Sequence, residues 1–408
     1  MKTQIIKLAF ILVALVTFSS CQSDDNGSNP EQTVTKAEVI SNYSNLVYQS
    51  YLDSYNLTLD LKSKITTFIA APSESGFNQV KTAWKAAREP YGQTEAYREC
   101  SGPVDTNNSS TTPWGLGIEG QMNAWPIDES YIDYVQAGTE PYANNYASII
   151  SNTSQPITVD LIANANEGVD DKSISAGWHA IEFLLWGQDN TVPADNQPGK
   201  RLYTDYSTAE FAVRRGQYLS VTTDLLLSDL QKLVNTWNVG GTYRTVFEAL
   251  DENTALKQLI NGAFFIAGDE LSSERIIAPV DSTVGIDNSG QEDEHSCFSD
   301  NTNRDVFANT KGVDNVLFGR YGSVSGASFY DLVLQEDATQ AKRLKDAAEL
   351  AMTKVNVIAV NPMPFDFLIT QESSEDIPAG PVMQSVQALF ELADEISASA
   401  SAIGINLQ

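Results

Sequence analysis

His179 and Glu182 are the pair of residues whose types and spacing most clearly permit chemistry. They stand three positions apart, and Glu182 opens the apolar stretch that continues to Trp186. Residues at this spacing project from one face of a helix, and a carboxylate among hydrophobic neighbours needs a partner because burying it unpaired is costly. A cation held between the imidazole and the carboxylate would satisfy both groups. A hydrogen bond between the two side chains, without a metal, is the alternative that the pair leaves open.

The small number of histidines and cysteines excludes several well-known metal sites. The chain has two histidines, His179 and His295, so a site built from three imidazoles cannot form. Neither histidine is followed by glutamate, which excludes the HExxH zinc motif. No two of the three cysteines have the spacing of a zinc finger or of a c-type haem attachment site.

Long helices are the elements that must position this pair. Thr35 and Glu38 form a capping-box pattern, and apolar residues then recur at three- and four-residue steps as far as Phe68. This pattern predicts one long amphipathic helix, broken at most once. A second helix is predicted over 77–88, and Pro90 should kink or restart it.

Two long loops interrupt the helical pattern, at 100–125 and at 281–309, where Gly, Pro, Asn, Ser and Thr or charged residues dominate. Loops of this length are often functional. Pro381 suits the first turn of a helix, and Gly404 suits the stop after the last turn. Further helices are predicted over 173–186, 205–237, 250–275, 337–360 and 381–402.

The two halves of the chain therefore follow one plan of helices separated by a long loop. A chain of 408 residues is too long for one ordinary core. No run of alternating apolar and polar residues predicts strands. We predict an all-α fold with an N-terminal helical domain over 35–238 and a C-terminal one over 239–408. The similar plan of the halves suggests a duplicated bundle.

The N-terminus has the pattern of an export signal over residues 1–20. Two lysines precede an apolar run, 8–18, which is too short to span a membrane as a helix. The residues before Cys21 resemble the lipobox of bacterial lipoproteins, and the polar segment 21–34 should be a flexible tether. No other stretch reaches 18 apolar residues, so we expect a lipid anchor alone to hold the protein at the outer membrane or surface of a diderm bacterium, with the periplasmic face as the alternative.

The net charge of the chain excludes some classes of binding partner. The formal net charge of −28 would repel phosphate backbones, so nucleic-acid binding and attachment to anionic lipid by a basic patch are not expected. In an oxidising compartment Cys100 and Cys297 could form a disulfide. Two separate thiols are the alternative.

The segment Gly177-Trp178-His179-Ala180-Ile181-Glu182 resembles the GxHxxE signature of imelysin-like proteins, a family also classed as imelysin peptidases. One stretch departs from the family pattern, because Thr302-Asn303-Arg304-Asp305 stands where the family often has Thr-His-Arg-Asp. This departure removes one imidazole. Other segments that agree in order are Trp84–Arg88 with Tyr91, Thr94-Glu95, Gly102–Asp105, Glu119–Pro126 and His295–Thr302.

The resemblance implies two four-helix-bundle-like domains related by duplication, with the long irregular loops and the signature segments meeting at their interface. It also implies export to the envelope and a link to iron acquisition. The implied metal ligands are His179, Glu182 and Glu119. The residues implied to line the site are Gly177, Glu95, Asp105, Trp125, His295, Ser296, Asp300 and Arg304.

Two functions follow from these residues, and a third is left open. In the first, a surface lipoprotein binds iron, or an iron complex such as haem, and passes it to an outer-membrane uptake partner. In the second, the protein is a zinc-dependent metallopeptidase in which a carboxylate such as Glu182 activates water. We rank binding first because a peptidase site normally needs three protein ligands and a separate base, and we assign no catalytic residue. The third is an adhesive or scaffolding lipoprotein.

Overall fold

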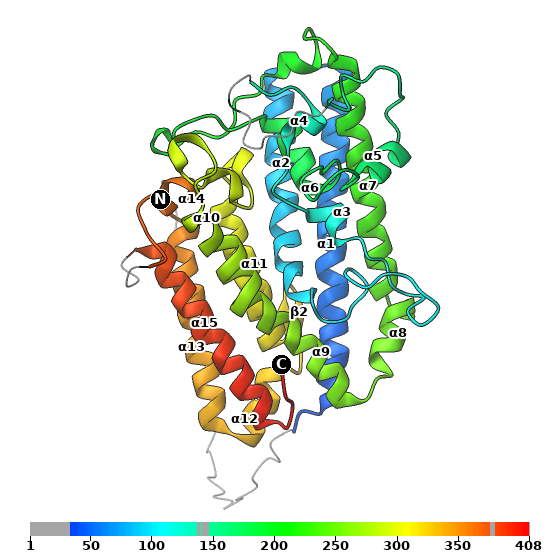
Figure 1. The fold of residues 1–408 in the computed structure, drawn as a ribbon. Coiled ribbons are helices and arrows are strands. Elements are labelled where there is room, and N and C mark those ends of the chain that lie inside the picture. Colours follow the sequence, from blue (N-terminus) through cyan, green and yellow to red (C-terminus); the bar gives the residue numbers. More distant parts are fainter. Residues whose placement is uncertain (1–32, 137–138, 140–146, 376–379, 408) are drawn as a thin grey trace, which may run out of the picture. The chain divides into compact units, whose positions relative to one another are not determined.

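The first long helix begins where its capping residues predict. In the computed structural model, which describes residues 33–136, 139, 147–375 and 380–407, helix α1 runs from Lys36 to Ala70 without a break (Figure 1). The Oγ1 atom of Thr35 accepts a hydrogen bond of 3.2 Å from the backbone N–H of Glu38, and the Glu38 carboxylate accepts one of 2.8 Å from the N–H of Thr35. The predicted capping box is confirmed.

Helix α1 packs against α2 (Glu74–Gln93) and α7 (Ala212–Trp237). The shorter helix α6 (Gly177–Trp186) lies against α2 and α7. Trp84 of α2 and Trp178 of α6 are both fully buried, and their rings meet edge to face with centroids 6.2 Å apart. Aromatic packing of this kind fixes α6 firmly, because each ring buries a large apolar area.

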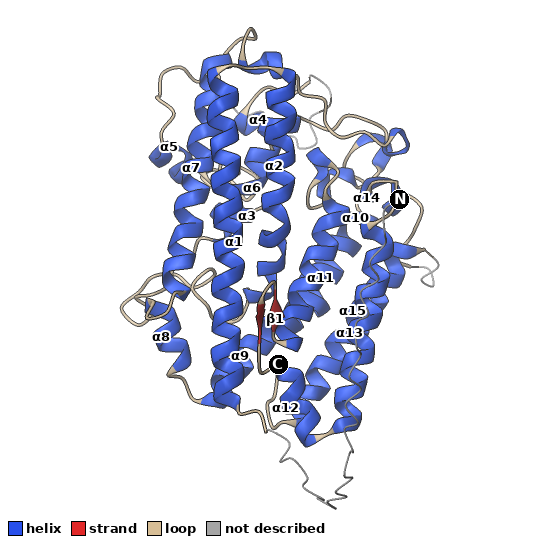
Figure 2. Cartoon of the chain, turned by 180° about the vertical axis from the view of Figure 1, so that it is seen from behind, coloured by secondary structure: helices blue, strands red, loops and turns tan. Residues whose placement is uncertain are grey.

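A second group of helices forms around α11, α13 and α15 (Figure 2). Helix α9 leads without interruption into a π-helical stretch, η4, which packs against α15. The helices of this group are α9 (Glu252–Phe265), η4 (Ile266–Ile277), α10 (Ala278–Asp281), α11 (Thr302–Phe318), α12 (Phe329–Glu336), α13 (Ala338–Ala359) and α15 (Pro381–Ala402).

The two groups meet where α2 lies beside α11 (Figure 2). A Cβ atom on Gly92 of α2 would lie 2.8 Å from the Cβ of Ala308 in α11, so only glycine allows the helices to come this close. Helix α9 also packs against α1. Residues from Val34 onward consequently form one compact unit. The predicted boundary at 238/239 falls between α7 and α8, and the origin of the two halves by duplication stays a prediction.

Short elements complete the structure. In the part of the chain that the structure describes, the only strands are β1 (Arg320–Tyr321) and β2 (Val324–Ser325), which pair antiparallel. The short helices are α3 (Glu119–Asn123), α4 (Glu129–Ile132), α5 (Val159–Ala165), α8 (Thr242–Glu248) and α14 (Phe365–Ile369), and the 3-10 turns are η1 (Thr94–Tyr97), η2 (Pro193–Asp195), η3 (Tyr203–Tyr206), η5 (Ile286–Asn288), η6 (Gln291–Asp293) and η7 (Cys297–Ser299). The predicted all-α fold class is confirmed.

Several predicted boundaries are wrong. The helix predicted from 205 begins only at Ala212. Helix α2 does not restart at Pro90 but continues to Gln93, so the one backbone hydrogen bond that proline cannot donate does not end the helix. The helix predicted from 173 begins only at Gly177. The predicted loop 281–309 ends at Thr302, where α11 begins. Helix α11 escaped prediction because it buries many polar residues, including Asp305 and Asn309, and so lacks a simple apolar stripe.

The predicted export signal, Cys21 and nearly all of the tether 21–34 lie outside the described residues. Within the described ranges, no helix combines the length and the apolar character that a membrane span requires.

Candidate functional site

Helix α6 presents His179 and Glu182 from a completely buried segment, since all ten of its residues are buried. Its first residue, Gly177, has a φ of +83°, which side chains rarely tolerate. A Cβ at this position would lie 2.6 Å from the carbonyl carbon of Met122 and 2.8 Å from the carbonyl oxygen of Gln121. Gly177 is therefore needed for α6 to begin directly against α3.

His179 and Glu182 form a hydrogen-bonded pair, as their spacing predicts. The Nδ1 atom of His179 lies 2.9 Å from Oε2 of Glu182, and the two side chains are 2% and 0% exposed. The other carboxylate oxygen, Oε1, accepts hydrogen bonds from the backbone N–H (3.0 Å) and the hydroxyl (2.7 Å) of Ser299. Burial raises the pKa of Glu182 to about 8 even though the bonds from Ser299 lower it. The carboxyl is thus mostly protonated at neutral pH.

Arg88 contacts both histidines. Its Nη2 atom is 3.5 Å from Nε2 of His179 and 3.1 Å from Nε2 of His295. Burial, together with the positive charge of Arg88 on both rings and of Arg275 most strongly on His295, holds the pKa of both histidines well below the ordinary value. Both imidazoles are therefore neutral.

Asp305 and Asn123 hold Arg88 in this position. The Nε atom of Arg88 lies 3.3 Å from Oδ1 of Asp305, and its Nη1 donates to the side-chain oxygen of Asn123. Asp305 also accepts a hydrogen bond from the hydroxyl of Ser296. A buried arginine is tolerated only when its charge and its donors have partners of this kind.

A cavity of about 10 Å³ lies beside the histidines. This volume holds a single water molecule or ion and nothing larger. Burial raises the pKa of Glu292 to about 8 and that of Glu294 well above its ordinary value. Neither carboxylate oxygen of Glu294 has a hydrogen-bond partner among the described residues. The cavity is lined by Trp125, Pro126, Ile127, His179, Glu182, Glu292, Glu294, His295, Cys297 and Phe298.

A second buried polar cluster surrounds Arg98 and Arg275. Glu95 joins it to the histidines, because its Oε2 pairs with Arg275 at 2.7 Å and its Oε1 accepts a hydrogen bond of 3.2 Å from Asn123. The guanidinium of Arg98 is shared among four carboxylates: Glu95 (3.4 Å), Asp105 (3.5 Å), Glu119 (3.4 Å) and Glu270 (3.0 Å).

A model of the imelysin family matches residues 47–396, which is most of the chain. This protein belongs to the imelysin family. Because this match includes the GxHxxE segment and all of the other family segments named above, the family resemblance predicted from the sequence is confirmed.

Individual relatives agree with this family. "Iron-regulated protein A" of Synechococcus elongatus is 23% identical over 339 residues, which cover 80% of this chain and 75% of the relative. The solved structure of an iron-regulated protein A precursor from Parabacteroides distasonis aligns with a TM-score of 0.67 at 20% identity, over 92% of this chain and 97% of the other. An imelysin-like protein from Psychrobacter arcticum aligns at 0.61 and 12% identity, over 92% and 98%. At these identities the solved structures establish a shared fold.

The structure brings together only part of the site predicted for this imelysin-family protein. His179, Glu182, His295 and Trp125 line one cavity, and Gly177 and Ser296 support it. Glu119 was predicted as a metal ligand, but it pairs with Arg98 and does not line the cavity. Burial raises its pKa to about 7. Glu95 and Asp105 belong to the same Arg98 cluster.

The predicted place of Arg304 needs correction, and of the two alternatives for the cysteines the structure has the separate thiols. Arg304 is 39% exposed, pairs with Glu89 and lies over the ring of Phe307, and it does not line the cavity. Cys100 and Cys297 are both free, and the disulfide that the sequence allowed is not formed. The thiol of Cys100 lies 2.7 Å from the backbone oxygen of Tyr97, whereas Cys297 lines the cavity.

Several residues of the site escaped the sequence analysis. Arg88 could have been found, because it lies four positions after Trp84 on the buried face of a helix, where an arginine needs buried partners. Glu292 and Glu294 gave no signal, since acidic residues in a polar loop are usually exposed. The other residues missed are Asn123, Asp305, Ser299 and Arg275.

Proposed function

We propose that this imelysin-family protein binds a single iron ion in the cavity beside His179 and His295, as a step in iron acquisition. One observation carries the proposal. A space of about 10 Å³ is lined by two neutral imidazoles and by Glu182, Glu292 and Glu294. Imidazole nitrogen and carboxylate oxygen are ligands that iron accepts in proteins, and a metal would displace the protons that these carboxyl groups hold at neutral pH.

The charge balance of the cavity supports a cation in spite of Arg88. Arg88 contributes one positive charge, but Asp305 lies 3.3 Å from it and offsets that charge. Three carboxyl groups line the cavity, and each gains a negative charge when it releases its proton. Negative charge then exceeds positive charge around the bound ion.

The size of the cavity favours an ion over haem. A volume of about 10 Å³ accepts one atom, whereas binding sites for ligands of drug size take roughly 300–1,000 Å³. Haem would therefore require the loop residues 291–300 to move away from α6. Arg88 would attract an iron complex with anionic ligands, but such a complex is also too large for the cavity.

The zinc metallopeptidase alternative has less support from this geometry. A catalytic zinc site keeps a position open for water and substrate, and a peptide needs a cleft beside it. Glu182 already accepts two hydrogen bonds from Ser299 and contacts His179, so it is poorly placed to activate a water molecule.

The proposed setting is the bacterial envelope. The relative from Synechococcus elongatus carries the name "iron-regulated protein A", which supports an iron-related role for this chain. We propose export through residues 1–20, lipidation at Cys21, and transfer of iron to an uptake partner in the outer membrane. Cys21→Ser should move the protein from the membrane fraction to the soluble fraction, and unchanged membrane association would refute the anchor.

The binding proposal is tested with full-length protein that is purified without an affinity tag and stripped with a chelator. Ferric ion, supplied as its nitrilotriacetate complex, is titrated by calorimetry, and bound metal is counted by elemental analysis. We expect one ion per chain, and His179→Ala and Glu182→Gln should each weaken binding by about tenfold or more. Glu349→Gln removes an exposed carboxylate from α13 and serves as the control.

Two outcomes would overturn this proposal. Equal ferric affinity in the wild-type protein, His179→Ala and Glu182→Gln would show that the cavity does not hold the ion. Cleavage of an unfolded polypeptide that requires zinc, stops with a chelator and disappears in Glu182→Gln would establish the metallopeptidase alternative instead.

A further inference from the structure

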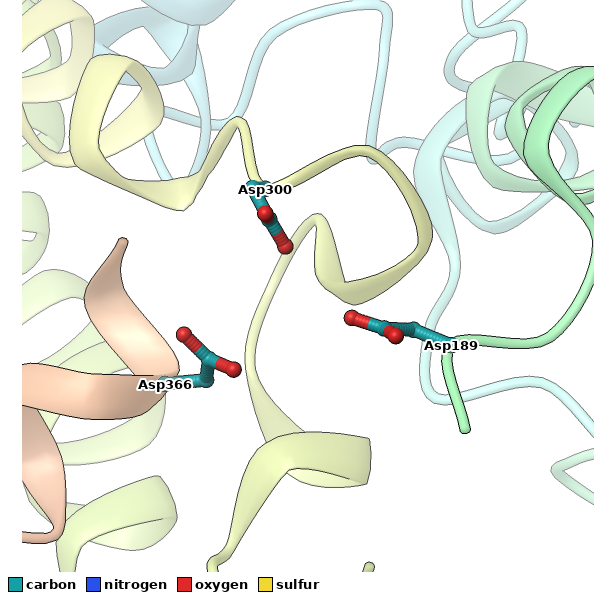
Figure 3. A group of neighbouring side chains, drawn as sticks. All are labelled: Asp189, Asp300 and Asp366. Atoms are coloured by element: carbon teal, nitrogen blue, oxygen red, sulfur yellow. The ribbon is translucent and has the colours of Figure 1, made fainter. Parts of the chain in front are cut away.

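Three aspartates from distant parts of the chain meet outside the cavity described above. Asp189 follows α6, Asp300 precedes α11, and Asp366 lies in α14. One carboxylate oxygen from each lies within 4.8 Å of the other two. Figure 3 shows that the three side chains point toward a common space. None of the three lines the cavity beside His179.

The hydrogen bonds of these aspartates leave oxygen atoms without partners. Oδ1 of Asp189 accepts from the backbone N–H (3.0 Å) and the hydroxyl (2.7 Å) of Thr191. Its Oδ2 has no hydrogen-bond partner among the described residues, although Asp189 is only 2% exposed. The side chain of Gln291 lowers the pKa of Asp189. A buried carboxylate oxygen that points into a shared space without a donor calls for a ligand there.

Electrostatic repulsion within the cluster points to the same need. Burial raises the pKa of Asp189 to about 6. Burial first, and then repulsion from neighbouring aspartates, raises the pKa of Asp300 to about 8 and that of Asp366 to about 7. Lys85 lowers the pKa of Asp300, and Lys200 lowers that of Asp189. Repulsion from Asp189 alone raises the pKa of Asp300 by more than Lys85 lowers it. A cation in the shared space would remove this repulsion.

We propose that Asp189, Asp300 and Asp366 bind a calcium ion. The three ligand groups are all carboxylates, which suit a hard cation and offer nothing to a soft one. Two oxygens on opposite sides of a calcium ion are about 4.6–5.2 Å apart, because Ca–O distances are about 2.3–2.6 Å. For magnesium the same separation is about 4.0–4.2 Å. Oxygen atoms that all lie within 4.8 Å of one another can contact one calcium ion together, and partly exposed Asp300 leaves access for water ligands.

Calcium at this position would join three segments that are far apart in sequence. Asp300 follows Ser299, which bonds to Glu182, and Asp189 stands seven residues after Glu182. Glu294, which lines the neighbouring cavity, is repelled most strongly by Asp366 and Asp300. The ion would thus fix one wall of that cavity, although the calcium site itself does not depend on the iron-binding proposal.

The test uses the full-length protein, stripped with a chelator and titrated with calcium alone and with magnesium alone. We expect one calcium ion per chain, affinity for calcium at least tenfold higher than for magnesium, and a rise in melting temperature when calcium is added. Asp189→Asn combined with Asp366→Asn should weaken calcium binding by at least tenfold and abolish that rise. Asn keeps the shape of Asp and relieves the repulsion, so the stripped variant should melt no lower than the stripped wild type.

The matched control is Asp346→Asn combined with Asp394→Asn. These aspartates lie in an acidic surface groove between α13 and α15 and carry the same two charges, so calcium binding should not change. If the first double variant does not fold, Asp300→Asn, at a half-buried position, replaces it with the same expected loss. No calcium binding, binding that magnesium matches, or equal loss in the control would each overturn the proposal.

The calcium proposal and the iron proposal can fail separately. His179→Ala should lose ferric binding and keep calcium binding, whereas the Asp189 and Asp366 variant should lose calcium binding. If His179→Ala abolishes the calcium signal, the calcium ion lies in the cavity beside His179, and the aspartate site is refuted.

Discussion

Ser299 donates two hydrogen bonds to the same carboxylate oxygen of Glu182, although 117 residues separate them in the sequence. The backbone N–H and the hydroxyl of Ser299 both reach Oε1, so Oε2 stays available to Nδ1 of His179. Helix α6 is thereby attached to the turn η7 that precedes α11. This contact sets the orientation of Glu182 in the cavity.

Ser299→Ala should lower the free energy of unfolding by about 1–3 kcal/mol, because the buried carboxyl of Glu182 loses one of its donors. Urea denaturation of the metal-free protein measures the change. Ser75→Ala, at an exposed position of α2, is the control and should alter stability by less than about 0.5 kcal/mol. An equal effect of the two substitutions would mean that the hydrogen bond from the Ser299 hydroxyl contributes nothing.

Gly177→Ala should be more damaging than the same change at Gly240. Both glycines have positive φ, +83° and +76°, so alanine costs about 1–2 kcal/mol at either position. At Gly240 the added Cβ meets nothing within 4 Å, whereas at Gly177 it collides with the backbone of α3. We expect Gly177→Ala to cost at least about 2 kcal/mol more in urea denaturation and to weaken ferric binding. Similar costs at the two positions would contradict the close approach of α6 and α3.

The long helices could be predicted because their signals are local. Thr35 and Glu38 mark the start of α1 by a reciprocal cap, and Asp337 caps α13, where its carboxylate accepts from the backbone N–H of Thr339 and Gln340. Pro381 occupies the first turn of α15, as predicted. Helix α11 lacks such signals, because its buried face is polar and satisfied by residues from other helices. Its existence depends on tertiary contacts that a local pattern does not contain.

The candidate site was predictable only where its residues share a helix or match a family segment. The pairing of His179 with Glu182 follows from their spacing, and the position of His295 beside them followed from the resemblance. Glu119 was wrongly predicted to be a metal ligand, because it pairs with Arg98 instead. This pairing depends on the conformation of the loop 100–118, which the sequence pattern does not give. Glu294 lines the cavity from a loop. The conformation of a loop cannot be predicted from a repeating pattern of apolar residues, because the loop has none.

Glu182→Gln should reduce the fall in stability of the metal-free protein between pH about 6.5 and about 8. The folded-state pKa of Glu182, about 8, is raised above its ordinary value. Glu182 therefore contributes its full stabilisation of the folded state at low pH, and this stabilisation is lost as pH rises through about 8. In the variant the decline should be less steep by up to about 1.4 kcal/mol per pH unit. The pH range of this test starts at about 6.5. Below that pH, protonation of His179 and His295 favours the unfolded state, because the folded state depresses the pKa of both histidines.

Urea denaturation at several pH values, in the presence of a chelator, gives the free energy of unfolding as a function of pH. The slope of this dependence is compared between the wild-type protein and Glu182→Gln. Glu349→Gln removes a carboxylate from the exposed surface of α13 and should leave the wild-type slope unchanged. If Glu182→Gln and the wild-type protein have the same slope, Glu182 is ionised in the folded state, and the cavity already carries its negative charge.

Removal of Arg88 distinguishes a bare iron ion from an anionic iron complex. Arg88→Met is combined with Asp305→Asn, because a lone buried charge would cost about 3–5 kcal/mol and obscure the result. For a bare cation, the variant frees Nε2 of His179 from the guanidinium 3.5 Å away, so ferric affinity should stay equal or rise by up to about tenfold. An anionic complex would lose its one positively charged contact at the histidines, and its affinity should fall by about tenfold or more. Calorimetry with ferric nitrilotriacetate and with ferric citrate measures both cases, and a fall with either reagent would contradict the binding of a bare ion in the cavity.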